Sequence, residues 1–174
     1  MTAPRFVEQL NEQIGNEYAA HQQYVACAVY YDGLTMPQMA AFFYAQAIEE
    51  RAHAMMMVRY LLDTDSEVRI PGVEAPNNAF ADIIAPIQLA LDQEKRVSQQ
   101  IYALTKTARE ENDFASEQFM QWFIKEQVEE VSTMSDLLTV VNRARNDIEA
   151  IEEYVKREQG SVSADPTAPP IAGA

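Results

Sequence analysis

Residues 39–60, MAAFFYAQAIEERAHAMMMVRY, decide the fold of this chain. Apolar side chains recur at helical spacing along one face of this stretch, at Met39, Phe43, Met57 and Tyr60. At mid-length the same face carries Glu50 and His53 instead. An ionised carboxylate that is buried alone costs several kcal/mol, so it needs a counter-charge. The stretch therefore predicts an amphipathic helix that points metal-ligand side chains into a core.

Three other stretches repeat this pattern, each with a polar break near the middle of an apolar stripe. The breaks are formed by Glu17, by Glu94, and by Gln127 with Glu130. We expect four long helices and a short fifth one, at about residues 4–32, 37–63, 82–111, 114–142 and 146–158. Counting from the turns near residues 33 and 112 brings the breaks level in two antiparallel hairpins. A shared cation is the simplest counter-charge for four carboxylates at one level.

The composition predicts a single all-α domain. Glycine is scarce, at 5 residues in 174, and the prolines lie outside the expected helices or near their starts. The connection at 64–81 can extend on the order of 55–60 Å, against about 42 Å for a long helix. It can cross the bundle and make the second and third helices parallel, although a loop that folds back is the alternative. We expect the domain at residues 1–159 and a flexible Pro- and Ala-rich tail at 160–174.

Charge and residue usage exclude several classes of function. The formal net charge is −14, whereas nucleic-acid binding needs a basic face, so no nucleic-acid partner is expected. An acidic surface attracts cations instead. The single cysteine, Cys27, suits a reducing compartment. We see neither a secretion signal nor an apolar run near 18 residues, and therefore expect a cytoplasmic protein without a membrane partner.

The polar breaks supply the ligands of a carboxylate-rich metal site. Glu50 and His53 are three residues apart, which puts both on one helical face. Glu50 joins Glu17, Glu94 and Glu130 in a set of four negative charges, enough for two divalent cations. Oxygen ligands with one imidazole suit iron, with manganese or zinc as competitors. Glu50 is best placed to bridge two metals roughly 3.5–4 Å apart.

Other residues near the breaks have two interpretations each. Tyr24, one heptad after Glu17, is either a core tyrosine or a hydrogen-bond donor at the site. Trp122 is a core residue or an electron donor. His21 is an auxiliary donor beside the metal ligands, or a polar histidine of the core or of an interface. Three further carboxylates could hold a third metal together with Glu130, or form an ordinary solvated face; they are Glu49, Glu126 and Glu129.

At these positions the chain resembles the bacterial non-haem ferritins, over roughly residues 6–158. The motifs are Asn-Glu-Tyr at 16–18 with Tyr24, Glu-Glu-Arg-Ala-His at 49–53, Asp-Gln-Glu at 92–94 and Gln-Trp-Phe-Ile-Lys-Glu-Gln-Val-Glu-Glu at 121–130. The resemblance implies a ferritin-like four-helix bundle with a long crossover between helices 2 and 3 and a short fifth helix. It also implies a ferroxidase that oxidises Fe(II) with dioxygen or hydrogen peroxide, and a 24-subunit shell that stores the ferric mineral.

The resemblance also assigns roles to single residues. Its catalytic set is Glu17, Tyr24, Glu50, His53, Glu94, Gln127 and Glu130. The first iron is held by Glu17, Glu50 and His53, and the second by Glu50, Glu94 and Glu130, with Gln127 nearby. The third metal site of bacterial members corresponds to Glu49, Glu126, Glu129 and Glu130.

Two departures from related families matter. Bacterioferritins place a haem-binding Met directly after the Glu of Glu-x-x-His, where this chain has Arg51, and they use a second Glu-x-x-His where it has Gln127 and Glu130. No haem is therefore expected. The tail beyond Gly160 is longer than the usual bacterial ferritin end. In some actinobacterial relatives such a tail is an address for loading into an encapsulating shell, which would add a partner.

Two other functions stay open at this point. The same centre would serve a di-iron oxidase or peroxidase that never stores iron, and a small oligomer would favour that function. A non-enzymatic helical scaffold whose tail binds a partner is the second alternative, and it would have no affinity for Fe(II).

Overall fold

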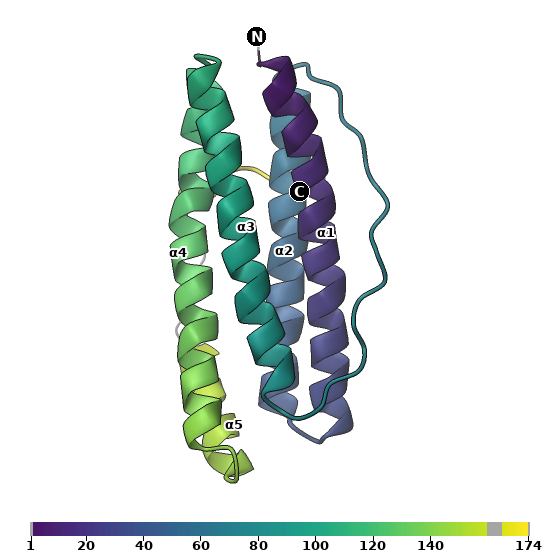
Figure 1. The fold of residues 1–174 in the computed structure, drawn as a ribbon, viewed down its shortest axis with the longest axis vertical. Coiled ribbons are helices and arrows are strands. Elements are labelled where there is room, and N and C mark those ends of the chain that lie inside the picture. The colour runs from purple at the N-terminus through teal and green to yellow at the C-terminus, as the bar shows by residue number, and fades with distance from the viewer. Residues whose placement is uncertain (1, 160–164, 174) are drawn as a thin grey trace.

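The computed structural model describes residues 2–159 and 165–173, and its helices there are α1 (Pro4–Gly33), α2 (Pro37–Asp63), α3 (Ala85–Glu110), α4 (Phe114–Arg143) and α5 (Ile148–Gln159). The first four helices run the length of the molecule, with α1 antiparallel to α2 and α3 antiparallel to α4 (Figure 1). The short α5 lies at one end, against α2 and α4. This confirms the predicted all-α fold, a four-helix bundle with a short fifth helix.

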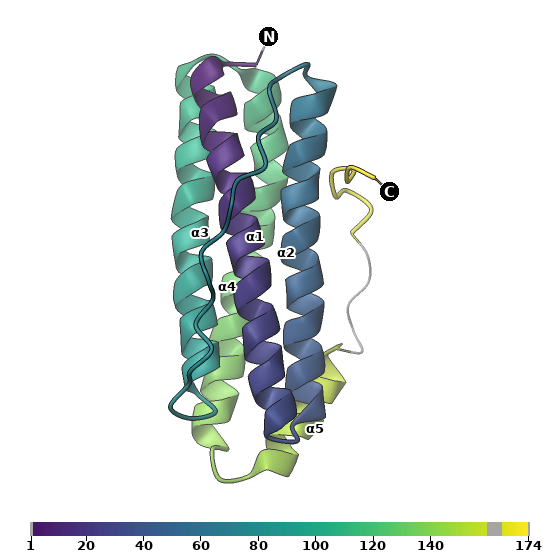
Figure 2. The ribbon, with the colours of Figure 1, turned by 90° about the vertical axis from the view of Figure 1, so that its right-hand side faces the viewer.

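The connection between α2 and α3 runs along the outside of α1 from one end of the bundle to the other (Figures 1 and 2). The side-chain amide of Asn11 donates to the carbonyl of Glu67 at 2.9 Å and accepts from the backbone N–H of Arg69 at 2.6 Å. Gln23 makes the same pair of bonds with Asn77, both at 2.9 Å. Because the connection crosses the whole bundle, α2 and α3 are parallel, as predicted.

Two helices begin later than the sequence predicted. The third was expected from Asp82 but begins at Ala85, because the Asp82 carboxylate accepts backbone hydrogen bonds at 2.9 and 3.0 Å just before the helix. The fifth was expected to open at Asn146. Its cap is instead Asp147, which accepts from the backbone of Ala150 at 3.0 Å. In both cases a carboxylate satisfies N–H groups that the first helical turn leaves without partners.

The start of α2 is capped from a distance. The backbone N–H groups of Gln38 and Met39 donate to the carboxylate of Glu152 on α5, at 2.8 and 3.0 Å. The residue before α2, Met36, makes no side-chain capping bond. The short fifth helix therefore fixes one end of the bundle as well as covering it.

Two apolar clusters fill the bundle, one on each side of its middle. The cluster next to α5 includes Tyr31, Phe43, Ile87 and Leu137. The cluster in the other half includes Phe6, Leu10, Ile101 and Met120. Along every long helix the polar break falls between the two clusters. Within the described residues, no helix combines the length and the hydropathy that crossing a bilayer requires.

Candidate metal centre

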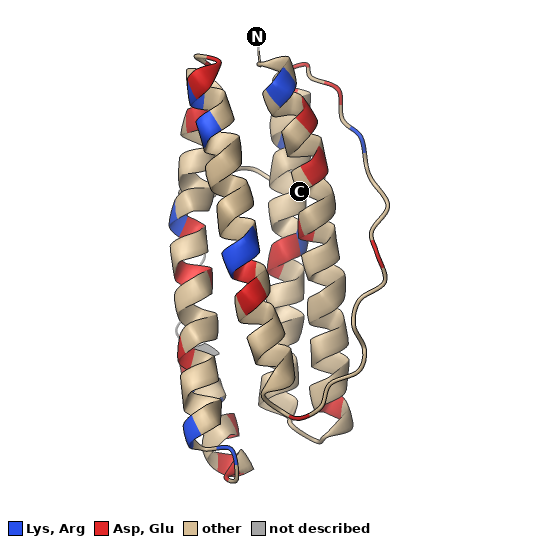
Figure 3. Ribbon diagram, in the orientation of Figure 1, with Lys and Arg blue, Asp and Glu red and all other residues tan. Residues whose placement is uncertain are grey.

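Six buried polar side chains meet at mid-length of the bundle. They are Glu17 of α1, Glu50 and His53 of α2, Glu94 of α3, and Gln127 and Glu130 of α4, each at most 4 % exposed. Acidic segments lie at this level of the long helices (Figure 3). Every one of these residues lies on the apolar stripe of its helix, so the packing that buries the stripe buries the charge as well. The structure therefore places together the residues that the sequence predicted to form the centre.

One side of the centre is formed by α1 and α2. Ligand atoms of Glu17, Glu50 and His53 lie within 4.8 Å of one another. The Nδ1 atom of His53 is 3.5 Å from Oε2 of Glu50. Gln13 donates to Oε1 of Glu17 at 2.8 Å, whereas Oε2 of Glu17 and both oxygens of Glu50 are buried without a hydrogen-bond partner. Buried polar atoms are rarely left unpaired, so these three oxygens are candidate ligand atoms.

The other side is formed around Glu94 of α3. The hydroxyl of Tyr24 donates to Oε1 of Glu94, and the side-chain amide of Gln127 donates to Oε2 at 3.4 Å. Ser98 donates to the amide oxygen of Gln127 at 2.9 Å, which sets the orientation of that amide. In this orientation Gln127 is a hydrogen-bond donor to a carboxylate rather than an oxygen ligand.

Burial raises the free energy of the charged forms of these side chains. The pKa values of Glu50 and Glu130 are raised well above the ordinary value by burial and by the neighbouring charge of Glu94. Burial also raises the pKa of Glu94 to about 7 and lowers the pKa of His53. None of the ion pairs in the described parts of the chain joins Glu17 or these carboxylates to a Lys or Arg. A bound cation would supply the missing positive charge.

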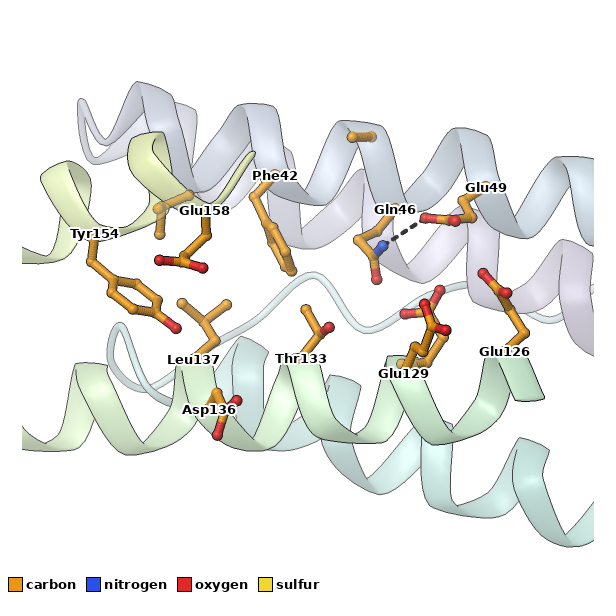
Figure 4. Close-up of a pocket in the computed structure, with 13 residues that line it drawn as sticks. Phe42, Gln46, Glu49, Glu126, Glu129, Thr133, Asp136, Leu137, Tyr154 and Glu158 are labelled. Atoms are coloured by element: carbon orange, nitrogen blue, oxygen red, sulfur yellow. Dashed lines mark hydrogen bonds between the residues drawn. The ribbon is translucent and has the colours of Figure 1, made fainter. Parts of the chain in front are cut away.

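A second acidic cluster lies beside the centre, between α2 and α4. Glu49, His53 and Glu126 bring ligand atoms within 4.8 Å of one another. Burial and the charges of Glu49 and Glu129 raise the pKa of Glu126 to about 7. A cavity of about 490 Å³ extends from these residues and Glu130 towards α5 (Figure 4). The three additional carboxylates of the sequence prediction therefore line one cavity next to the centre.

The structure also shows residues that the sequence interpretation did not assign to the site. Gln13 orients Glu17, Ser98 orients Gln127, and the Gln46 side chain donates to Oε2 of Glu49 at 2.9 Å. Gln13, Ser98 and Gln46 each lie three or four residues from a carboxylate of the site on the same helix. That spacing places them on the same face and was the available signal.

His21 and Trp122 have structural surroundings of their own. Nδ1 of His21 lies 2.6 Å from the backbone carbonyl of Ala47, so this histidine joins α1 to α2. The ring of Trp122 packs edge-on against the His53 ring, with centroids 5.6 Å apart.

Four long helices that bury carboxylates and a histidine at one level form the arrangement that carboxylate-type metalloproteins of the four-helix-bundle class use for their metal sites. The chain matches the family described as Ferritin-like domain over residues 7–144. It is 51 % identical over 169 residues to a protein named Ferritin BfrB of Mycolicibacterium smegmatis, covering 97 % of this chain and 93 % of that protein. It is 34 % identical to a bacterial non-heme ferritin of Staphylococcus aureus, covering 90 % and 94 %. The chain belongs to the ferritin family, which confirms the predicted resemblance to bacterial non-haem ferritins.

Solved structures agree with this assignment. An open pore ferritin from the hyperthermophilic archaeon Archaeoglobus fulgidus superposes with a TM-score of 0.87 at 28 % identity. The match covers 90 % of this chain and 97 % of that one. The overall fold of this chain is therefore shared with a solved ferritin.

Proposed function

We propose that this protein stores iron, and that it oxidises Fe(II) to Fe(III) at the buried centre before the ferric product is mineralised. The observation that carries the proposal is the surroundings of Glu50. Both of its oxygens are buried without a donor, and it lies among Glu17, His53, Glu94 and Glu130. A carboxylate in that position can bridge two cations. Membership of the ferritin family supports iron as the substrate.

The residues divide into two candidate iron positions that share Glu50. Glu17, Glu50 and His53 would bind the first iron, and Glu50, Glu94 and Glu130 would bind the second. Four carboxylates neutralise two divalent cations, and hard oxygen donors with one imidazole suit Fe(II). Gln127, predicted as a further ligand, would act here by holding Glu94. It would become a ligand only if its amide turned over and broke the bond from Ser98.

The reaction needs two electrons, which two Fe(II) ions supply by losing one each. Dioxygen accepts both electrons with two protons and becomes hydrogen peroxide, or hydrogen peroxide accepts them with two protons and becomes two water molecules. The chain fixes the geometry: the Tyr24 hydroxyl holds Glu94, and Gln13 holds Glu17. Fixed ligands bring the two ions together for one two-electron step.

The cluster of Glu49, Glu126 and Glu129 is proposed to hold a third cation together with Glu130. Glu130 lines the same cavity as these three residues, so it links the cluster to the centre. A cation leaving the centre could therefore pass to carboxylates that are already directed into the cavity (Figure 4).

Storage requires a closed shell, which we propose is the 24-subunit assembly of the family. Large apolar side chains on the outside of the bundle support contacts between copies. Val29, Leu62 and Phe114 are 56, 58 and 70 % exposed. Apolar side chains exposed to this extent suit a surface that another subunit covers. The predicted address function of the tail, the mobility of residues 160–174, and the cytoplasmic location stay predictions; residues 160–164 lie outside the described part of the chain.

Iron loading tests the proposal. Metal-free protein is loaded with excess Fe(II) in air and gel-filtered, and iron per chain is measured against elution volume. We expect hundreds of irons per chain in a very large particle. About two per chain in a small oligomer would make the protein a di-iron oxidase instead, and no retained iron would contradict the metal site itself.

The chain contains two histidines, which gives a matched control for the site assignment. Glu50→Ala and His53→Ala should abolish rapid Fe(II) oxidation while circular dichroism shows intact helices. His21→Ala makes the same chemical change outside the proposed ligands and should keep the oxidation rate. Unchanged kinetics in Glu50→Ala and His53→Ala would refute the assignment.

A further inference from the structure

The end of the chain lies against the bundle beside the acidic cluster. Residues 165–173 follow the side of α2 (Figure 2). The backbone N–H of Ala172 donates to the carbonyl of Met55 at 3.2 Å, and Ala168 and Ile171 pack against the apolar cluster of this half. Asp165 and Ala168 line a second cavity, of about 590 Å³, together with Glu49, His53, Glu126 and Glu129. This segment is therefore a wall of the cavity that contains the acidic cluster.

Asp165 is the polar anchor of the segment. Its Oδ2 accepts from Lys125 Nζ at 2.9 Å and from Trp122 Nε1 at 3.2 Å. Its Oδ1 accepts from the backbone N–H and the hydroxyl of Thr167, at 2.8 and 2.6 Å. Both oxygens are thus engaged with donors, so Asp165 is not a free ligand for a cation. The part of Asp165 that matters for the cavity is its contact with the Lys125 ammonium.

Lys125 is the one residue with a permanent positive charge among the described residues that line the two cavities. It precedes Glu126 directly and lies one turn before Glu129, on the same helix. Its ammonium nitrogen is 2.9 Å from Asp165 but 3.8 Å from Glu129. The ammonium group therefore makes its short contact with the tail rather than with the cluster.

We propose that Asp165 is a positioning residue for the acidic cluster: it draws the Lys125 ammonium into a 2.9 Å contact and leaves only a longer, 3.8 Å ion pair with Glu129, so that the cluster carboxylates stay available to a cation. The inference rests on the proposed function, because it concerns the third cation position. A lysine that pairs with a cluster carboxylate competes directly with a metal ion for it. When Asp165 is absent, Glu129 and Glu126 remain as negative groups that act on the ammonium.

The cluster itself has a separate sign of being built for a cation. Gln46 is 8 % exposed, lines the neighbouring cavity and donates its amide N–H to Glu49, while its Oε1 is buried without a hydrogen-bond partner. A buried amide oxygen without a donor next to three carboxylates matches the oxygen ligands of hard cations. The tail thus acts beside a position where carboxylates and an amide oxygen outnumber the single positive charge of Lys125.

Terbium(III) titration tests the inference, because the chain has one tryptophan and Trp122 lies next to the cavity, where it sensitises terbium luminescence. The component of the titration that Glu126→Gln removes is assigned to the cluster. Its midpoint is then compared in the unchanged protein, Asp165→Asn, Lys125→Met and the double variant. Using the midpoint rather than the amplitude removes any effect of the substitutions on Trp122 emission.

We expect Asp165→Asn to weaken the cluster component about two- to fivefold, the factor that a partly exposed ion pair supplies. Lys125→Met should strengthen it, and adding Asp165→Asn to Lys125→Met should then have a smaller effect than in the unchanged background, because only the direct charge of Asp165 near Glu126 is lost. Lys106→Met and Asp63→Asn make the same charge changes in ion pairs elsewhere on the surface and should leave the midpoint unchanged.

Three results would overturn the inference. They are an Asp165→Asn midpoint equal to that of the unchanged protein, an equal effect of Asp165→Asn in the Lys125→Met background, and a titration with no component that depends on Glu126. The proposed function is judged separately, from oxidation of the first two Fe(II) per chain. Asp165→Asn should leave that step unchanged, so failure of one proposal is distinguishable from failure of the other.

Discussion

Glu50 and Glu94 lie at the same level on the parallel helices α2 and α3, yet their surroundings differ. Both are buried. Glu94 accepts a hydrogen bond on each oxygen, from Tyr24 and from Gln127, whereas neither oxygen of Glu50 has a donor. A carboxylate with donors is oriented in advance, and one without donors depends on a cation or a proton. The centre therefore combines a fixed wall at Glu94 with an open position at Glu50.

The pKa shifts reflect the same difference. Burial raises the pKa of Glu94 to about 7, but the hydrogen bonds from Tyr24 and Gln127 work in the opposite direction. For Glu50, burial and the charges of Glu94, Glu17 and Glu130 all raise the pKa. The free energy that a cation releases on binding should therefore depend most on Glu50.

The largest effect is expected from exchanging each carboxylate for its amide. Glu50→Gln should slow Fe(II) oxidation at least about 100-fold, because the bridging charge is lost; the partners of ligands alone are commonly worth 10–100-fold. Without metal at pH 8, Glu50→Gln should not lower the free energy of unfolding. Glu94→Gln should raise it less than Glu50→Gln does, because losing the charge-assisted hydrogen bonds from Tyr24 and Gln127, about 1–3 kcal/mol, offsets the gain from removing a buried charge.

Stopped-flow oxidation kinetics and urea unfolding measure both quantities. If Glu50→Gln destabilises the metal-free protein more than Glu94→Gln does, the contrast between an open and a fixed position is wrong.

The second prediction concerns pH. The folded-state pKa of Glu94, about 7, lies above the ordinary value of 4.5. Folding then favours the protonated form, so the associated stability is complete below about pH 4.5 and is lost as the pH rises through 7. Glu50 and Glu130 are shifted in the same direction. The metal-free protein should lose on the order of 3 kcal/mol between pH 5 and pH 8.

Urea unfolding at both pH values, with and without Zn(II) as a redox-inert cation, measures this loss. Zn(II) should stabilise the protein more at pH 8, where the carboxylates are ionised, and Glu94→Gln should reduce the pH dependence. A metal-free stability that stays flat from pH 5 to pH 8 would contradict the cause assigned to these shifts.

The open side of the centre could be predicted from the sequence better than the fixed side. Glu50 and His53 interrupt an apolar stripe at a spacing that places both on one face, so periodicity alone identifies them. Ser98 lies four residues after Glu94, so its spacing places it on the face of the centre, but that spacing does not indicate that its hydroxyl reaches Gln127 on another helix. The helix lengths followed from the same stripes. The length of the connection permitted a crossover without excluding a loop that folds back, and the resemblance to ferritins implied the crossover.

Long-range polar contacts could not be predicted in this way. The α2 cap comes from Glu152, more than a hundred residues later in the chain. Asp165, which accepts hydrogen bonds from Trp122 and Lys125, belongs to a tail whose sequence has no periodic pattern. Such contacts depend on where short segments dock after the bundle has formed. Periodicity describes one element at a time, so it contains no information about them.

The smallest effect is expected from Tyr24→Phe, which removes the donor to Glu94 and leaves every proposed ligand in place. Because Tyr24 is fully buried, phenylalanine fills nearly the same space, and helicity should not change. Loss of a partner that orients a ligand should slow Fe(II) oxidation about tenfold, the lower end of such effects.

Tyr31→Phe is the matched control, since Tyr31 is equally buried but donates to the backbone carbonyl of Ile83 in the crossover. Each variant removes one buried tyrosine hydroxyl from α1, so both should lose comparable stability, about 1 kcal/mol. Only Tyr24→Phe should slow oxidation. If the two variants slow oxidation equally, the effect comes from loosening α1 in general, and the fixed wall at Glu94 has no separate part in the reaction.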